Sequence, residues 1–146
     1  STNINLFDEN GIYNSKEYPK VIKREDFLFN SPIVHPAIMA RKEAYDLVEG
    51  YRDIDITVRV EDYDLFMRMF SKGVTMHVIQ ECLLDYRDDR ANSIRRKKYK
   101  YRINEAKVRY YGFKELKLLP KGLIYVIKPL IMGIVPVQII RMIRKG

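Results

Sequence analysis

The stretch Glu61-Asp62-Tyr63-Asp64-Leu65-Phe66-Met67-Arg68-Met69-Phe70 is the part of the sequence that most strongly decides the fold. Its apolar residues recur at spacings of three and four, which is the pattern of a helix with one face packed on a core. The residues in this pattern are Leu65, Phe66, Met69 and Phe70. We therefore expect a helix from Glu61 to Ser71 that ends before Gly73, because glycine commonly follows a helix in the left-handed conformation.

Three carboxylates crowd the start of this helix, where the positive end of the helix dipole stabilises them. Asp62 precedes Leu65 and Phe66 by three and four residues, so we expect it at the edge of the buried face. A carboxylate that is partly shielded from water there suits a general base. An acidic first turn that only stabilises the helix has the same pattern, and spacing alone favours this second interpretation.

Shorter elements are expected on both sides of this helix. Before it we expect a strand over 4–8 that turns at Asn10-Gly11 into a strand at 12–13, a short helix over 25–30, a buried strand over 33–40 and a helix over 41–48 ended by Gly50. After it we expect strands over 74–79 and 83–86 and a long basic helix from Asn92 to about Tyr111, ended by Gly112. This order predicts an α/β fold with a helical C-terminal extension.

Composition places the chain among globular proteins. It has 146 residues, of which 47% are hydrophobic and 32% charged, which fits one domain and excludes disordered and fibrous classes. Cys82 is the only cysteine, so an intramolecular disulfide is excluded and a reducing compartment is expected. With two histidines and no Cys/His cluster, a structural zinc site is excluded as well.

Charge is unevenly distributed along the chain. Residues 1–86 carry 10 Lys and Arg against 15 Asp and Glu, a net charge of −5, whereas residues 87–146 carry 17 against 4, a net charge of +13. Seven of these cations lie between Arg90 and Arg102, with Tyr99 and Tyr101 among them. The basic half is thus suited to an anionic partner, which could be nucleic acid, a phosphate-bearing ligand or an acidic membrane surface.

The C-terminal segment over 118–143 is mostly apolar. Its longest uncharged run, Pro129 to Ile140, has 12 residues, well short of the roughly 20 that span a bilayer. We favour a helix that lies in the membrane interface, held by flanking cations and anionic lipids. A helix docked on its own domain or on a partner, a true membrane span, and nucleic-acid binding are the alternatives, and self-association is expected without a membrane.

An ordered set of short motifs runs through the first two thirds of the chain. The set comprises His35-Pro36-Ala37-Ile38-Met39 with Arg41-Lys42, then Gly50-Tyr51-Arg52-Asp53, then Glu61-Asp62-Tyr63-Asp64-Leu65 with Arg68, then Lys72-Gly73, and then Glu81, Leu83, Leu84, Tyr86-Arg87 and Ser93. In order and spacing it resembles glycosyltransferase family 2. More closely, it resembles the C-terminal half of the GT-A (nucleotide-diphospho-sugar transferase) domain of bacterial enzymes that make cell-surface polysaccharides.

The resemblance implies transfer of a sugar from a nucleotide-sugar donor to an acceptor hydroxyl, with inversion at the anomeric carbon. It places the general base on Asp62, the acceptor pocket at Glu61 and His35, and the donor diphosphate beside Arg87. Two of these assignments have a structural alternative. His35 also fits a histidine in a pocket wall, and Arg87 also fits an ordinary surface arginine after a strand. The sequence departs from the family pattern just after Arg87, where Asp88 and Asp89 stand in place of a histidine that many family members carry.

The family's donor-binding half, with its Asp-x-Asp metal motif, belongs before the residues matched here. Asp53-Ile54-Asp55 and Asp62-Tyr63-Asp64 have that spacing but come after the motif's place, so no metal ligand is expected in this chain. A divalent cation, Mg²⁺ or Mn²⁺, is expected for the intact enzyme only. We therefore expect residues 1–93 to be the acceptor-side half of a catalytic domain and residues 94–146 a basic helix with an apolar, membrane-associated tail.

These expectations describe a fragment that is inactive by itself and belongs to an enzyme at the cytoplasmic face of the bacterial plasma membrane, as a peripheral protein. Its expected partners are a nucleotide-sugar donor and a sugar or lipid-linked acceptor, and nucleic acid is not favoured. The alternative is a non-catalytic, basic amphipathic module that binds membrane surfaces or nucleic acid.

Overall fold

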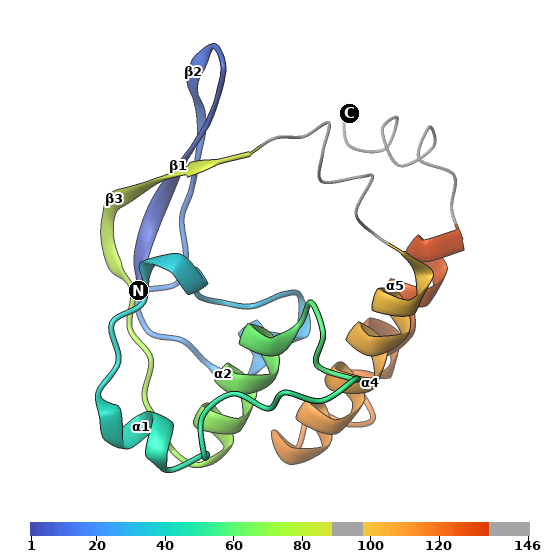
Figure 1. Ribbon diagram of the computed structural model, residues 1–146. Helices are drawn as coiled ribbons and strands as arrows, with labels where there is room; N and C mark the ends of the chain where they lie inside the picture. Colours follow the sequence, from blue (N-terminus) through green and yellow to red (C-terminus); the bar gives the residue numbers. More distant parts are fainter. Residues whose placement is uncertain (89–97, 135–146) are drawn as a thin grey trace.

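Figure 1 shows the computed structural model of the chain, which describes residues 1–88 and 98–134. Three strands form a sheet in the order β2-β1-β3, so the first strand of the chain is the central one. β1 (Thr2–Asp8) pairs antiparallel with β2 (Gly11–Lys16) and parallel with β3 (Ile79–Arg87). Because β2 and β3 lie on opposite sides of β1, the connection between them must pass across the sheet, and this long crossover carries helices. The fold is mixed α/β, as predicted.

The β1–β2 hairpin turns where the sequence predicts it. Gly11 begins β2 with φ +105°, a left-handed conformation that glycine adopts without strain. β2 continues to Lys16, beyond the predicted strand at 12–13, and Figure 1 shows the hairpin projecting from the rest of the molecule. Ile4 and Leu6, two residues apart on one face of β1, are buried and pack with Val34 in a small core.

Helix α2 (Glu61–Ser71) has the bounds that the apolar periodicity predicts. Leu65, Phe66 and Met67 on its buried face are at most 1% exposed, and they belong to the main hydrophobic core. The other fully buried side chains of this core include Phe27, Val108 and Phe113. α2, which belongs to the crossover, therefore lies between the earlier part of the crossover and the C-terminal helices, as Figure 1 shows.

Short helical segments form the rest of the crossover. They are η1 (Arg24–Leu28), η2 (His35–Ala37) and α1 (Lys42–Asp46). η1 and α1 match the helices predicted over 25–30 and 41–48. Gly50 follows α1 with φ +68°, which is the left-handed conformation expected after a helix end.

The buried strand predicted over 33–40 is wrong. The Ala37 N–H donates to the Val34 carbonyl at 3.0 Å and the Ile38 N–H to the His35 carbonyl at 3.3 Å, so these groups bond within the segment. Pro36 has no N–H to give to a neighbouring strand, and its fixed φ suits the short helix η2. The apolar run thus forms a turn, and His35 is exposed on it.

The strand predicted over 83–86 is confirmed as part of a longer strand, β3, which begins at Ile79 and ends at Arg87. The strand predicted over 74–79 is wrong, because only Ile79 of that range belongs to β3. Met76 and Val78 are buried, which accounts for the alternating pattern before it. There the chain makes an isolated bridge between His77 and Val21 instead of a ladder.

Helix α4 (Tyr99–Glu115) packs against α2 and against α5 (Leu123–Ile134). The predicted helix end at Gly112 is wrong, because α4 continues to Glu115 with Gly112 buried inside it. A Cβ on Gly112 would overlap the side chain of Met67, so this glycine serves the close approach of two helices and not a turn. The predicted helix start at Asn92 lies outside the described residues.

Arg109 of α4 is 2% exposed and joins three parts of the core. Its Nη1 donates to the Leu28 carbonyl at 2.9 Å and its Nη2 to the Phe29 carbonyl at 3.1 Å, beyond the end of η1. Its guanidinium carbon lies 5.2 Å from the centre of the Tyr63 ring in α2, and Glu105 pairs with its charge. A buried arginine needs partners of this kind because an unpaired charge is costly away from water.

The boundary predicted between residues 1–93 and 94–146 falls outside the described residues and stays a prediction. In the described part, α2 and α4 contribute to the same core. α5 continues through Pro129, which is buried, and residues 135–146 of the predicted tail lie outside the description. Across 1–88 and 98–134, no helix combines the length and hydrophobicity that crossing a membrane requires.

Candidate functional site

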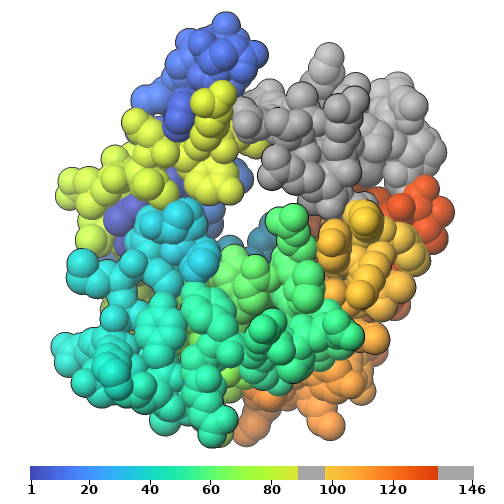
Figure 2. Space-filling view, viewed as in Figure 1, coloured from blue at the N-terminus to red at the C-terminus, as the bar shows by residue number. Residues whose placement is uncertain are grey.

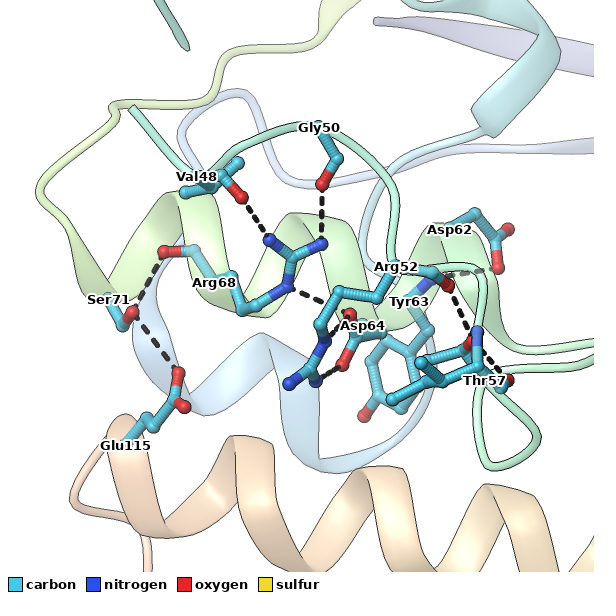
Figure 3. A network of polar contacts seen from close by, with 11 residues as sticks. Val48, Gly50, Arg52, Thr57, Asp62, Tyr63, Asp64, Arg68, Ser71 and Glu115 are labelled. Atoms are coloured by element: carbon cyan, nitrogen blue, oxygen red, sulfur yellow. Dashed lines mark hydrogen bonds and ion pairs between the residues drawn. The ribbon is translucent and has the colours of Figure 1, made fainter. Parts of the chain in front are cut away.

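Three carboxylates lie in the first turn of α2, at Glu61, Asp62 and Asp64, as predicted. Val60 precedes the helix and provides no side-chain cap, and the negative charges of the first turn lie at the positive end of the helix dipole. Oδ1 of Asp62 accepts a hydrogen bond from the Tyr63 N–H at 2.8 Å (Figure 3). Glu61 is exposed and Asp62 is half-buried, so both can meet a ligand.

Asp64 has the opposite environment, since it is only 3% exposed. Arg52 donates to both of its oxygens, through Nε to Oδ2 at 3.0 Å and through Nη2 to Oδ1. Nε of Arg68 donates to Oδ2 at 2.8 Å. Two guanidinium groups, one of them from the same helix, therefore neutralise this carboxylate.

The same arginine fixes the loop that follows α1. Arg68 donates through Nη1 to the Val48 carbonyl at 2.6 Å and through Nη2 to the Gly50 carbonyl at 2.7 Å. Arg52, two residues further along, is held by the buried carboxylate described above. The chain is thus anchored to α2 on both sides of Tyr51, and Figure 3 shows these contacts along one side of the helix.

Tyr51 meets His35 in a cluster of rings. Its hydroxyl lies 2.7 Å from Nε2 of His35. The His35 ring centre is 6.1 Å from that of Phe66, which lies one helical turn beyond Asp62, and the ring of Tyr45 is 6.2 Å from that of Tyr51. Tyr51 is 42% exposed and His35 is exposed as well, so the cluster is open to solvent.

The charges of α2 act on this cluster. Burial raises the pKa of Tyr51 to about 12, together with Tyr45 and, to a smaller extent, the negative charges of Asp62 and Glu61. The two carboxylates are therefore close enough to influence the phenol. With such a pKa the hydroxyl keeps its proton at neutral pH, and it donates to a neutral His35 imidazole or accepts from a protonated one.

Three of the four predicted site residues are gathered in this region. Glu61 and Asp62 are adjacent at the start of α2, and His35 contacts Tyr51 and has its ring centre 6.1 Å from that of Phe66 on the same helix. Arg87 lies apart from them, at the last position of β3, where its partner in the sheet is Phe7 of β1.

Figure 2 shows a hollow on one face of the molecule, and three of the described elements lie along its edge. The residues around η2 (cyan), the start of α2 (green) and β3 (yellow) border it. The elements that carry His35, Asp62 and Arg87 therefore share one depression, although they are distant in sequence.

Tyr51 is the residue of this site that sequence reasoning missed. Its contact with His35 joins two loop residues that are 16 positions apart, and no periodicity connects them. The available signal was an aromatic residue between Gly50 and Arg52 in one of the quoted motifs. That signal does not reveal which side chain the ring meets.

The site does not fit a divalent cation. In the described part of the chain, no group of three or more His, Cys, Asp or Glu side chains could hold a metal ion. Asp62 and Asp64 have the spacing of an Asp-x-Asp motif, but Asp64 is occupied by Arg52 and Arg68. A hard cation needs several oxygen ligands that converge, and this pair offers one accessible carboxylate.

Comparison with known proteins found two similar sequences. The chain is 33% identical over 144 residues, 99% of its length, to a Bacillus subtilis (strain 168) protein named "Putative glycosyltransferase EpsE", of which it covers 51%. It is 32% identical over 84 residues, 58% of its length, to an Escherichia coli protein named UDP-Gal:alpha-D-GlcNAc-diphosphoundecaprenol beta-1,3-galactosyltransferase, of which it covers 30%. No family model and no solved structure matches the chain.

The chain thus spans about half the length of the Bacillus subtilis protein and about a third of the Escherichia coli protein. Both relatives carry glycosyltransferase names, so the likeness supports a glycosyltransferase. The mixed α/β fold with its small sheet is consistent with such a domain.

Proposed function

We propose that this chain is part of a glycosyltransferase that moves a sugar from a nucleotide-sugar donor to an acceptor hydroxyl in polysaccharide synthesis. The observation that carries the proposal is the similarity to a glycosyltransferase-named protein along 99% of the chain. The motifs favour family 2 and the GT-A fold, with this chain as the C-terminal, acceptor-side part. A non-catalytic basic module is not favoured, because the similarity extends over α2 as well as the basic segment.

In this proposal Asp62 is the general base. One of its oxygens is held by the Tyr63 N–H, and its second oxygen can accept a proton. As the acceptor oxygen attacks the anomeric carbon, its proton passes to Asp62. The bond from that carbon to the donor diphosphate breaks, and the nucleoside diphosphate leaves with the electron pair. A single displacement of this kind inverts the anomeric centre.

The other predicted residues have supporting roles. Glu61 and His35 would line the acceptor pocket beside Asp62. Arg87 would approach the donor diphosphate from β3, because a guanidinium can donate two parallel hydrogen bonds to phosphate oxygens. Its support is the hollow that β3 shares with η2 and the start of α2 (Figure 2).

The donor-binding part of the enzyme would be supplied by a region outside the sequence described in this structure. The relatives are about twice as long as the matched region or longer, which leaves room for such a part. We propose that Mg²⁺ or Mn²⁺, where the intact enzyme uses one, is held there, since the described carboxylates do not fit a cation. By itself this chain would then be inactive.

We also propose that the protein is peripheral at the cytoplasmic face of the bacterial plasma membrane. α5 carries four isoleucines at spacings of three and four that are 50–76% exposed, and we call them the isoleucine ridge. They are Ile124, Ile127, Ile131 and Ile134. Lys121 and Lys128 beside the ridge are exposed and can meet anionic lipid headgroups. Without a membrane the same ridge would favour self-association.

The function is tested with the natural protein that contains this sequence. It is incubated with UDP-galactose, UDP-glucose or UDP-N-acetylglucosamine, and with N-acetylglucosamine diphosphate on a short synthetic lipid as acceptor. The name of the Escherichia coli relative motivates this choice of acceptor. We expect a disaccharide product whose new linkage has the inverted configuration by NMR. Absence of product and of nucleotide release with every pair would contradict the proposal.

A further inference from the structure

We propose that Tyr51 is an acceptor-positioning residue, whose ring and hydroxyl hold the acceptor sugar beside Asp62. The rings of His35 and Tyr45 complete the wall against which the sugar lies. This inference rests on the proposed function and adds a residue that neither the motifs nor the relatives' names assign.

The backbone at Tyr51 is fixed in place before any ligand arrives. The Gly50 carbonyl on one side accepts a hydrogen bond from Arg68 at 2.7 Å. The Arg52 side chain on the other side donates to the buried carboxylate of Asp64. A residue in a loop that is anchored to a helix on both sides loses little backbone freedom when a ligand binds, and a positioning group needs this property.

The side chain of Tyr51 is available to a ligand. It is 42% exposed, although its hydroxyl contacts His35 at 2.7 Å and its ring lies near that of Tyr45. A pyranose ring has apolar C–H faces and hydroxyl edges. Sites for such molecules combine aromatic surface with a few fixed polar groups. The cluster next to Asp62 has this composition.

The Tyr51 hydroxyl has a hydrogen-bonding site left for a ligand. A phenol donates one hydrogen bond and offers two lone pairs, and His35 and Tyr45 take two of these three positions. When Nε2 of His35 carries no proton, it accepts the hydrogen bond from Tyr51, and the remaining lone pair of Tyr51 can accept from a sugar hydroxyl. When Nε2 carries a proton, Tyr51 accepts from it and can donate to the sugar instead. In both cases one bond to a non-reacting hydroxyl of the acceptor is possible.

This role differs from that of Asp62. The Tyr51 phenol stays neutral because its pKa is raised by burial, by Tyr45 and by the nearby carboxylates, so it is a poor proton acceptor for the reacting hydroxyl. It therefore acts on binding and orientation, while Asp62 takes the proton. Loss of the Tyr51 hydroxyl should weaken acceptor binding, whereas loss of the Asp62 charge should slow the chemical step.

The experiment compares Tyr51→Phe, Tyr51→Leu and Asp62→Asn in the natural protein with the three UDP-sugars and the synthetic acceptor named above. The matched control is Tyr110→Phe, since Tyr110 has the same 42% exposure and lies on α4 away from the site. We expect Tyr51→Phe to raise the acceptor KM about five- to tenfold. The donor KM and the kcat at saturating acceptor should stay within about twofold, and Tyr51→Leu should raise the acceptor KM further.

The outcomes separate this inference from the proposed function. No transfer by the wild-type protein, or unchanged transfer by Asp62→Asn, contradicts the proposed function and the inference with it. If Asp62→Asn is inactive while Tyr51→Phe and Tyr51→Leu keep the wild-type acceptor KM, the inference alone is overturned. A fall in kcat at an unchanged acceptor KM, or an equal rise in KM for Tyr110→Phe, overturns it as well.

Discussion

Asp62 and Asp64 are two residues apart on α2, yet their carboxylates lie in opposite environments. Asp64 is 3% exposed and is neutralised by Arg52 and Arg68, whereas Asp62 is half-buried and accepts one N–H of its own helix. The carboxylate of Asp64 therefore stabilises the fold, and that of Asp62 remains available for chemistry. Single substitutions at these two positions should therefore affect different properties: stability at Asp64 and catalysis at Asp62.

Asp64→Asn should destabilise the chain markedly, because it leaves two arginine side chains without their buried anion. We expect a loss of about 3 kcal/mol in the free energy of unfolding, measured by urea denaturation. Asp62→Asn is the matched control, and it should cost about 1 kcal/mol or less. Equal losses in the free energy of unfolding for the two variants would contradict the different roles assigned to Asp64 and Asp62.

Gly112→Ala should also destabilise the chain. The added methyl group would overlap the sulfur and the terminal methyl group of Met67, which is fully buried. We expect a net cost of about 1–2 kcal/mol, since overpacking costs about 1–3 kcal/mol and alanine returns about 1 kcal/mol of helix propensity.

A double-mutant cycle with Met67→Ala isolates this contact. Met67→Ala removes the overlapping sulfur and methyl group, so Gly112→Ala should become neutral or stabilising in that background. The same cost in both backgrounds would mean that Gly112 serves another purpose. Thermal and urea unfolding of the four proteins measures the cycle.

The long helix α2 could be predicted from sequence because eleven residues repeat one pattern, and its bounds proved right. The segment around Pro36 could not, because an apolar run of eight residues fits a strand or a turn, and proline decides between them only through local hydrogen bonds. Gly112 was misplaced for a similar reason. A glycine near a helix end predicts a cap, and only the position of Met67 shows that it serves packing.

The candidate site was predicted in part. The acidic turn with Asp62 is a local feature that the sequence displays. The hydroxyl of Tyr51 meets His35 only because Arg68 and Arg52 fix the loop against α2. Such tertiary contacts leave no periodicity in the sequence. The roles of Asp62, Glu61, His35 and Arg87 stay predictions until activity is measured.

The stability of the chain should depend on Tyr51 at high pH. Its pKa is raised from 10.0 to about 12 in the folded state, so ionisation favours the unfolded chain between these values. The stabilising effect is complete below pH 10 and is lost as the pH rises to about 12. We expect the stability advantage of wild type over Tyr51→Phe, measured by urea unfolding, to shrink over this range. A constant difference from pH 9 to pH 12 would contradict this expectation.

The isoleucine ridge should bind anionic membranes. Replacement of Ile127 and Ile131 by glutamate should weaken binding to phosphatidylglycerol vesicles at least about tenfold, because burial of each isoleucine is worth about 1.5–3 kcal/mol. The matched control is Ile12→Glu on the β hairpin, where the isoleucine is 60% exposed. Sedimentation with vesicles measures the binding. Binding that is unchanged by the ridge variant, or equal for phosphatidylcholine vesicles, would contradict the membrane proposal.

The central claim is that Asp62 is the general base of a sugar transfer, and the kcat of Asp62→Asn in the natural protein tests it most directly. The asparagine keeps the size of the side chain and removes its ability to take a proton. We predict a fall in kcat of about 10²–10⁴-fold, with an unfolding curve close to that of wild type. Transfer at near the wild-type rate by a folded Asp62→Asn protein would contradict the claim.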